Sequence, residues 1–154
     1  MQVRRTVPIA ALFLAGSCLW AQGKPAALEA NKKVVYDFYR VVWEPKNLAA
    51  LPQYMGDDYV EHNPMFNGGR DDLVRFLKTG RFGDWSKTAP PVDKLNDPPA
   101  LIMAEGDLVT WIFKRNRKDP KDSAKNYESF WFDTFRIRNG KIVEHWDGAT
   151  RPAQ

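Results

Sequence analysis

Apolar side chains recur at helical spacing in the first half of the chain. Between residues 28 and 42 they stand at Leu28, Val35, Phe38, Tyr39 and Val42. This spacing is close to the period of an α-helix and predicts a first helix. We expect it to end near Pro45, since proline has no amide hydrogen for a helical bond.

A second, short helix is predicted over residues 47–55. Pro52 either kinks this helix or occupies its first turn, and Gly56 is expected to cap its end. Residues 59–64 should be extended, because a proline at position 64 disfavours helix in the residue before it.

Residues 71–80 predict a third helix, with two aspartates at its start and Gly80 after its apolar face. The proline-rich segment 81–99 indicates a loop, in which residues 92–95 are a candidate strand.

The rest of the chain is rich in β-branched and aromatic residues. It predicts strands over residues 100–105, 108–117, 127–138 and 141–150. Three helices followed by consecutive strands predict an α+β fold, with helices packed on one face of a curved, mostly antiparallel sheet. Such an arrangement encloses a pocket.

Residues 1–23 have the pattern of a secretory signal peptide, which leaves residues 24–154 as the folded domain. Two arginines precede a short apolar run, residues 9–14, and Ala21-Gln22-Gly23 has the small-x-small spacing of a cleavage site. The run is shorter than the roughly 20 residues that span a bilayer, so an uncleaved membrane helix is the weaker alternative. We expect an exported protein, periplasmic or secreted, without stable membrane insertion.

Cys18 is the only cysteine and lies inside this signal region. Lipid anchoring at Cys18 stays an alternative, since small residues precede it, although Ser17 displaces the lipobox-like run by one position. After ordinary cleavage the mature chain has no thiol, which excludes disulfides and cysteine catalysis.

The mature chain is nearly neutral, with 21 basic against 19 acidic side chains once the two signal arginines are removed. The basic cluster of residues 115–121 is interleaved with aspartates. This mixture favours a solvated loop over a nucleic-acid site, and no nucleic-acid partner is expected.

The end of the chain predicts a β-hairpin around the turn Asn139-Gly140. Four of its ionisable residues lie among bulky aromatics: Asp133, Glu144, His145 and Asp147. An unpaired carboxylate is costly to bury in such a place. By alternation His145 shares the face of Asp147, and Glu144 shares that of Trp146, so one pair should face the pocket. The other pair should be structural or at a dimer interface.

Two motifs identify a family resemblance. Tyr59-Val-Glu-His-Asn-Pro64 and Arg138-Asn-Gly-Lys-Ile-Val-Glu-His-Trp-Asp147 resemble the SnoaL-like polyketide cyclase family of the nuclear-transport-factor-2-like superfamily. The resemblance covers residues 28–149 and implies a cone-shaped α+β fold and a homodimer. It does not imply one reaction, because the family includes cyclases, isomerases, dehydratases, hydrolases and non-catalytic binders.

The resemblance also implies a catalytic position. In characterised cyclases of the family, an aspartate late in the last strand is the acid/base of an intramolecular aldol condensation, and that position falls on Asp147. A histidine in the preceding strand assists there, and the matching position is Asp133. Asp133 thus puts a second carboxylate where the cyclases have a histidine, a possible hydrogen-bond donor, and the chain departs from the cyclase pattern at this position.

The residues themselves allow two interpretations of each aspartate. Asp147 is either a general acid/base whose pKa is raised by desolvation, or a strand-end carboxylate bound to backbone amides. Asp133 is either the paired acid, with His62 or Tyr39 as its partner, or half of a salt bridge to an arginine. A regular two-residue turn places the two aspartates on opposite faces, so both reach one pocket only if a β-bulge shifts one strand.

Ligand contacts are expected from residues near the pocket. His62 should lie at its mouth, where it either orients a ligand as a neutral imidazole or fastens the loop. Most aromatic residues should build the core, and some should line the pocket. The candidates for ligand contact are Tyr36, Tyr39, Trp131, Trp146 and His145.

The sequence has no close-spaced metal-ligand motif, phosphate loop or nucleophile elbow, so neither metal nor cofactor is expected. We interpret the chain as an exported protein with a hydrophobic pocket for a small carbonyl-bearing ligand. Its predicted chemistry is cofactor-independent acid/base catalysis of the aldol, isomerisation or dehydration type. A non-catalytic binding or dimerisation module is the alternative.

Overall fold

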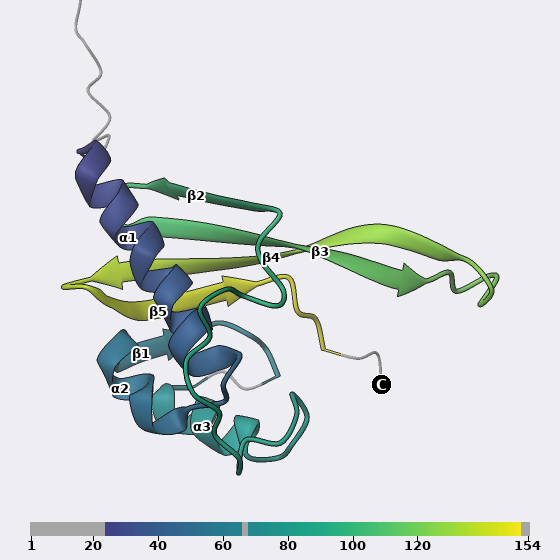
Figure 1. Cartoon of the computed structure of the whole chain (residues 1–154), viewed down its shortest axis with the longest axis horizontal. Helices are drawn as coiled ribbons and strands as arrows, with labels where there is room; N and C mark the ends of the chain where they lie inside the picture. The colour runs from purple at the N-terminus through teal and green to yellow at the C-terminus, as the bar shows by residue number, and fades with distance from the viewer. Residues whose placement is uncertain (1–23, 66–67, 152–154) are drawn as a thin grey trace, which may run out of the picture.

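The computed structural model describes residues 24–65 and 68–151 and has one curved sheet with helices on one side (Figure 1). Its strands are β1 (Met55–Glu61), β2 (Leu101–Glu105), β3 (Leu108–Lys118), β4 (Asn126–Arg138) and β5 (Lys141–Asp147). They lie in the order β1-β5-β4-β3-β2. β1 pairs with β5 in parallel, and the other pairings are antiparallel. The predicted α+β fold is confirmed, whereas the predicted signal peptide lies outside the described residues.

The first helix, α1 (Pro25–Phe38), begins with a proline in its first turn, where a missing amide hydrogen costs nothing. It continues as a π-helical turn, Tyr39–Trp43. Val35, Phe38 and Val42 are buried, so the periodic apolar positions of the sequence are the ones that pack on the sheet.

Two short helices lie beside β1. A 3-10 turn, Leu48–Ala50, leads into α2 (Leu51–Tyr54), which has Pro52 in its first turn and is not kinked by it. α3 (Arg70–Leu77) carries two acids in its first turn, as predicted.

Gly56 is not a helix cap, contrary to expectation, but the second residue of β1. A Cβ atom there would lie 3.1 Å from Cγ1 of Val143 and 2.7 Å from a carboxylate oxygen of Asp58. The close approach of β5 therefore explains the glycine.

The segment between α3 and β2 forms a loop, and the candidate strand at residues 92–95 is absent. The amide of Val92 donates to the carbonyl of Arg40 at 3.1 Å, and Leu95 is buried. These contacts hold the segment against the helical layer without a strand partner.

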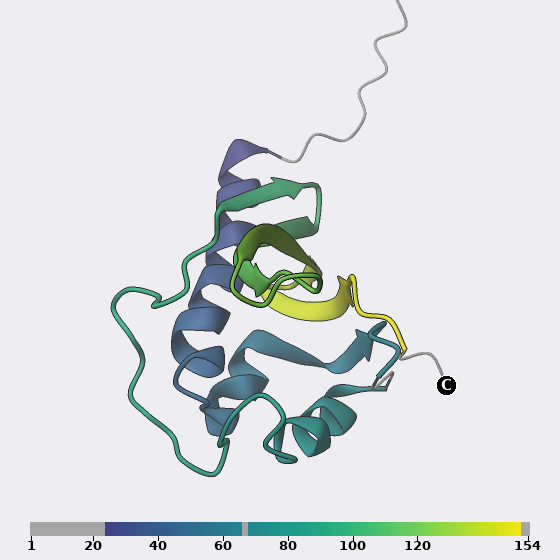
Figure 2. The same ribbon diagram turned by 90° about the vertical axis from the view of Figure 1, so that its right-hand side faces the viewer.

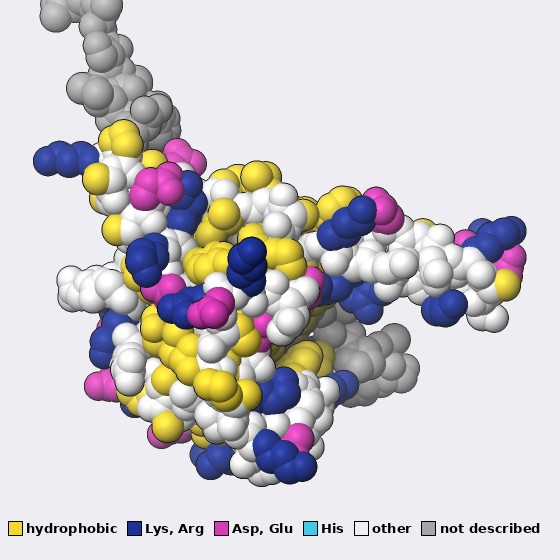
Figure 3. Space-filling view, in the orientation of Figure 1, with side chains coloured by type: hydrophobic (Ala, Val, Ile, Leu, Met, Phe, Trp, Pro, Cys, Tyr) yellow, Lys and Arg dark blue, Asp and Glu magenta, His cyan; other side chains and the backbone are white. Residues whose placement is uncertain are grey.

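Two hairpins form most of the sheet. In the β4–β5 turn both Asn139 and Gly140 have positive φ, 52° and 71°, which is the type I′ geometry that suits twisted strands. The β3–β4 pairing continues to Lys118 and Asn126. This hairpin projects beyond the body of the molecule, and Figure 3 shows Lys, Arg, Asp and Glu side chains along it.

The core lies between α1 and the concave face of the sheet. Figures 1 and 2 show α1 crossing this face, with α2 and α3 next to β1. Trp111, Val109 and Ile142 are fully buried beneath the helix. Within residues 24–65 and 68–151, no helix has both the length and the apolar character needed to cross a membrane.

Candidate functional site

A β-bulge at Val143 interrupts the closing hairpin. Ile137 of β4 pairs with Ile142 of β5, but the preceding β4 residue, Arg136, pairs with Glu144. Val143 is therefore an extra residue on β5. The strand beyond it presents its side chains to the face opposite to that of a regular hairpin.

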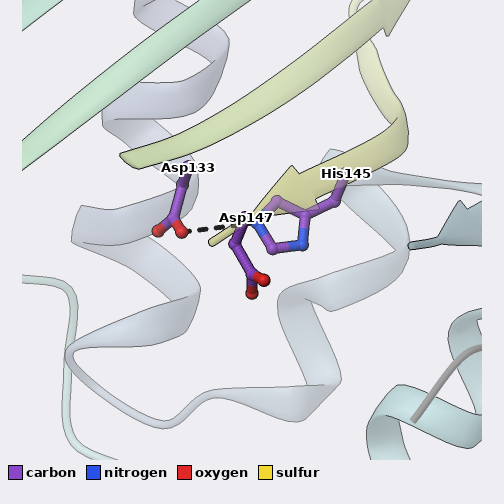
Figure 4. A group of neighbouring side chains, drawn as sticks. All are labelled: Asp133, His145 and Asp147. Carbon is purple, nitrogen blue, oxygen red and sulfur yellow. Dashed lines mark ion pairs between the residues drawn. The ribbon is translucent and has the colours of Figure 1, made fainter. Parts of the chain in front are cut away.

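The bulge brings the two hairpin aspartates together. Asp133 pairs with Asp147, and Phe135 pairs with His145. Paired residues point to the same face of a sheet, so these side chains share the helix-covered face. Figure 4 shows the two carboxylates directed to one side with the imidazole beside them. The condition for a shared site is thus met.

Asp133 is 9% exposed, and both of its oxygens accept hydrogen bonds. Tyr39 Oη donates to Oδ2 at 2.7 Å, and Trp131 Nε1 donates to Oδ1 at 2.7 Å. Burial and the nearby carboxylate raise the pKa of Tyr39, so its phenol stays protonated and remains a donor. Of the partners considered from the sequence, Tyr39 is present, and within the described chain no arginine pairs with Asp133.

His145 lies between two carboxylates. Its Nδ1 is 2.9 Å from Oε1 of Glu61, and its Nε2 is 3.5 Å from Oδ1 of Asp133. Burial lowers the pKa of His145, but the hydrogen bonds and charges of Asp133 and Glu61 outweigh burial and raise this pKa to about 10. The ring is therefore an imidazolium at neutral pH. It stacks on Phe135, with 4.8 Å between ring centroids.

Glu61 is buried and is hydrogen-bonded by two residues close to it in the sequence. It accepts hydrogen bonds from Tyr59 Oη and, at 2.9 Å, from the amide of Asn63. Burial and then Glu61 raise the pKa of Tyr59, so this phenol also stays protonated. A continuous series of contacts runs through Tyr59, Glu61, His145, Asp133 and Tyr39.

Asp147 lies at the end of β5 and is held by two donors. Asn63 Nδ2 donates to Oδ2 at 2.7 Å, and the backbone amide of Ala149 donates to Oδ1 at 2.8 Å. The carboxylate thus has the backbone contact expected of a strand-end aspartate and also faces the shared site. The two interpretations of Asp147 are compatible in geometry.

These groups line a cavity of about 440 Å³, a size typical of small-molecule sites. Much of its wall is aromatic: Phe38, Trp43, Phe82, Phe113, Trp131 and Phe135. Among the predicted site residues, the cavity is lined by Tyr39, Trp131, Asp133, His145 and Asp147. Their functional roles stay predictions.

Three predicted residues do not line this cavity: Tyr36, His62 and Trp146. His62 follows an inward-facing residue and points to the other face of the sheet. Its Nε2 is 2.8 Å from Oε1 of Glu144, and its ring stacks on Trp146. Tyr36 packs toward Trp111 in the core, with ring centroids 6.1 Å apart. None of these three residues therefore reaches a ligand in this cavity, and their expected ligand contacts stay predictions.

Five polar residues of the cavity were not predicted from the sequence as site residues: Tyr59, Glu61, Asn63, Arg115 and Arg117. Tyr59, Glu61 and Asn63 are each two residues apart along and just after β1, and Arg115 and Arg117 are two residues apart in β3. This period-2 spacing places alternate residues of a strand on one face. Once one member is known to face inward, this spacing identifies the others. The sequence alone does not say which face is inward.

The shared site also has the geometry of a possible metal centre. One donor atom each from Asp133, His145 and Asp147 lie within 4.8 Å of one another. As an imidazolium, His145 has no free lone pair, so a metal ion would have to displace its proton. The cluster therefore takes either a proton on His145 or a metal ion.

Solved structures with the same fold include AclR from Streptomyces galilaeus, 18% identical with a TM-score of 0.53 and 78% of both chains covered. An NTF2-like protein of unknown function from Burkholderia pseudomallei K96243 is 14% identical, with a TM-score of 0.54 and coverage of 79% of this chain and 91% of that chain. TerC, co-crystallised with polyporic acid, is 15% identical, with a TM-score of 0.51 and coverage of 79% and 92%. These similarities show the fold alone. No curated protein sequence matches the chain.

Residues 35–145 match the family described as the SnoaL-like domain. The match covers most of the chain and extends from the buried part of α1 to His145 in β5. The chain therefore belongs to the SnoaL-like domain family and has its nuclear-transport-factor-2-like fold.

Proposed function

We propose that the protein is a cofactor-independent acid/base catalyst for a small hydrophobic ligand that carries a carbonyl group. Asp147 removes the proton from the carbon next to the carbonyl and later returns it. His145 donates a hydrogen bond from Nε2 to the carbonyl oxygen as negative charge develops there. An aldol, isomerisation or dehydration reaction can each begin with this step.

The observation that carries this proposal is the presence of a cationic imidazole and a carboxylate in one apolar cavity. The Nε2 contact to Asp133 is long, 3.5 Å, so this N–H is available to a ligand oxygen. With its pKa near 10, His145 stabilises an enolate without losing its proton at neutral pH. Asp133 acts as the paired carboxyl group that holds this cation, and Tyr39 holds Asp133.

Solvent deuterium exchange tests the first step without knowledge of the natural ligand. The probe is 2-tetralone, a bicyclic ketone with exchangeable α-protons, and NMR follows its α-deuteration in D₂O. We expect the protein to accelerate exchange and Asp147→Asn to reduce that acceleration by about 100-fold or more, the usual contribution of a general base. Asp93→Asn is the matched control, because Asp93 is exposed in the loop before β2 and outside the cavity.

Exchange at full rate in a folded Asp147→Asn variant would exclude Asp147 as the base. An equal loss in Asp93→Asn would show that the effect comes from charge in general.

A non-catalytic ligand-binding module is the second candidate. It is supported by the two donors that already satisfy Asp147, the side chain of Asn63 and the amide of Ala149. The same experiment separates the candidates: 2-tetralone that binds in the cavity without accelerated exchange favours the binding module.

We also propose that the protein acts outside the cytoplasm. The support is the signal-like pattern of residues 1–23. N-terminal sequencing of the mature protein from its host should find a start after Ala21 or Gly23. A protein that starts at Met1 and lies in the cytoplasmic fraction would contradict export. A lipid-modified Cys18 at the start of the mature chain would instead show a membrane-anchored protein.

A further inference from the structure

The cavity has two polar ends of opposite charge. One end holds Glu61, Asp133 and Asp147 around the single cation of His145. Two arginines of β3 also enter the lining: Arg115, whose guanidinium lies over Phe113, and Arg117, further along the strand toward the other end. The wall between the two ends is aromatic. A ligand that fills this cavity meets an acidic end and a basic end.

The strand register gives the separation of the two ends. Asp133 pairs with Trp111, so Arg115 lies four residues and Arg117 six residues further along β3. At ~3.3 Å per residue, the two arginine backbones lie about 13 and 20 Å from the level of Asp133. Long arginine side chains shorten this gap to the length of a ligand of two or three fused rings.

The two arginines differ in how far they are already occupied. Arg115 Nη1 contacts Oδ2 of Asp97 at 2.5 Å, and its guanidinium lies over the ring of Phe113 at 4.2 Å. Arg117 makes no ion pair within the described part of the chain. Since a guanidinium pairs best with a planar, bidentate anion, Arg117 has an unused carboxylate-binding capacity at the rim of the cavity.

We propose that the ligand is an aromatic or polycyclic compound with a carboxylate, bound by Arg117 with Arg115 beside it. The acidic end repels this carboxylate, so the ligand enters with its opposite end toward Asp147 and His145. The orientation of the carbonyl rests on the proposed acid/base function. The preference for an anion does not rest on it, because it follows from the arginines alone.

Binding of a matched pair of probes tests the anion preference. The probes are 2-naphthoate and neutral 2-naphthamide, similar in shape, and calorimetry measures both affinities. We expect naphthoate to bind about tenfold more tightly than naphthamide, as for a partly exposed charge-assisted hydrogen bond. Arg117→Gln should remove this preference and leave naphthamide binding unchanged.

Lys118→Gln is the matched control. It removes the same charge from the neighbouring residue, which does not line the cavity. Equal affinities of the two probes for the wild type, no measurable naphthoate binding, or an equal loss in Lys118→Gln would overturn the proposal. A preference for the anion without accelerated exchange of 2-tetralone would contradict the acid/base function and support the anion subsite. Accelerated exchange without a preference for the anion would support the acid/base function and contradict the anion subsite.

Discussion

His145 is a buried side chain whose charge depends on its two carboxylate neighbours. The side chain of His145 is 12% exposed, and that of Glu61 is 1% exposed. An ion pair taken out of water is stable only when its remaining polar atoms are also bonded. Tyr59 and the amide of Asn63 do this for Glu61, and Tyr39 and Trp131 do it for Asp133. The imidazolium is thus part of the native fold as well as of the proposed chemistry.

The raised pKa of His145 predicts a loss of stability at alkaline pH. The pKa is about 10 in the folded protein against an ordinary value of 6.5. Between these pH values the folded state holds one more proton than the unfolded state, so stability falls as pH rises. The contribution is fully present below pH 6.5 and is lost as pH rises through about 10. Urea unfolding at several pH values should show the wild type losing stability relative to His145→Gln across this window.

His62→Gln is the control for this measurement, because the side chain of His62 is 41% exposed and lies on the other face of the sheet. Parallel pH profiles for the wild type and His145→Gln would contradict the raised pKa. Glu61→Gln should shift the alkaline loss of stability to lower pH, since it removes one of the two carboxylates that keep His145 protonated.

At the scale of elements, the bulge in β5 decides which side chains form the site. Ile142 and Val143 are neighbours in sequence, and both are buried, 0% and 6% exposed. A regular strand cannot bury two consecutive side chains against one layer, so the local chain bends and the register shifts. The absence of a side chain at Gly56 gives Val143 the space it needs.

Deletion of Val143 should therefore remove the bulge and leave the pairing beyond it unchanged, with Arg136 opposite Glu144 and Asp133 opposite Asp147. His145 and Asp147 would keep facing the cavity, because paired residues point to the same face of a sheet. We expect a loss of about 2 kcal/mol in the free energy of unfolding, because the buried side chain of Val143 is removed. NMR should still show a protonated His145 at pH 8.

Deletion of Ser123, in the exposed connection between β3 and β4, shortens the chain equally without changing the register of β5. A neutral His145 at pH 8 in the variant without Val143, but not in the variant without Ser123, would contradict the register in which Val143 is the extra residue.

Hydrophobic periodicity predicted the elements well where one face is buried against one layer. α1, β3 and β4 are of this kind, since their periods reflect burial directly. The predictions were wrong where contacts with residues distant in sequence determine the local structure. Gly56 has the sequence context of a helix cap, but β5 draws it into a strand. Residues 92–95 have strand-like composition, but no strand edge is available to them.

The candidate site was predicted in part for the same reason. Asp133, Tyr39 and Asp147 could be chosen from their types and positions, and a bulge could be named as a requirement. Its location could not, because it depends on how Val143 packs against β1. The sequence did not place His62 outside the cavity, because the face of β1 that points inward is set by the parallel pairing of β1 with β5.

At the scale of the whole molecule, the two faces of the sheet have different surroundings. The helices cover the concave face, and in the described part of the chain none covers the other (Figures 1 and 2). Cross-strand pairing aligns Leu101, Ile112 and Phe132 on this outer face. Leu101 and Phe132 are 52% and 51% exposed. Such a patch of exposed apolar side chains indicates an interaction surface.

We expect this outer face to pair with a second copy of the chain. Its charged groups already pair within the molecule: Arg136 contacts Glu144 at 2.8 Å and Asp107 at 3.0 Å. Charges that are already paired offer little to a strongly acidic or basic partner, whereas a two-fold axis pairs an apolar patch with itself. Sedimentation equilibrium should find a dimer in the wild type and a folded monomer in Phe132→Lys, because a lysine charge would be buried at the centre of the interface. Tyr127→Lys is the matched control, since Tyr127 lies on the opposite face of β4 and is similarly exposed, 47%. A monomeric wild type, or a dimer unaffected by Phe132→Lys, would assign the patch to another partner and leave the cavity complete within one chain.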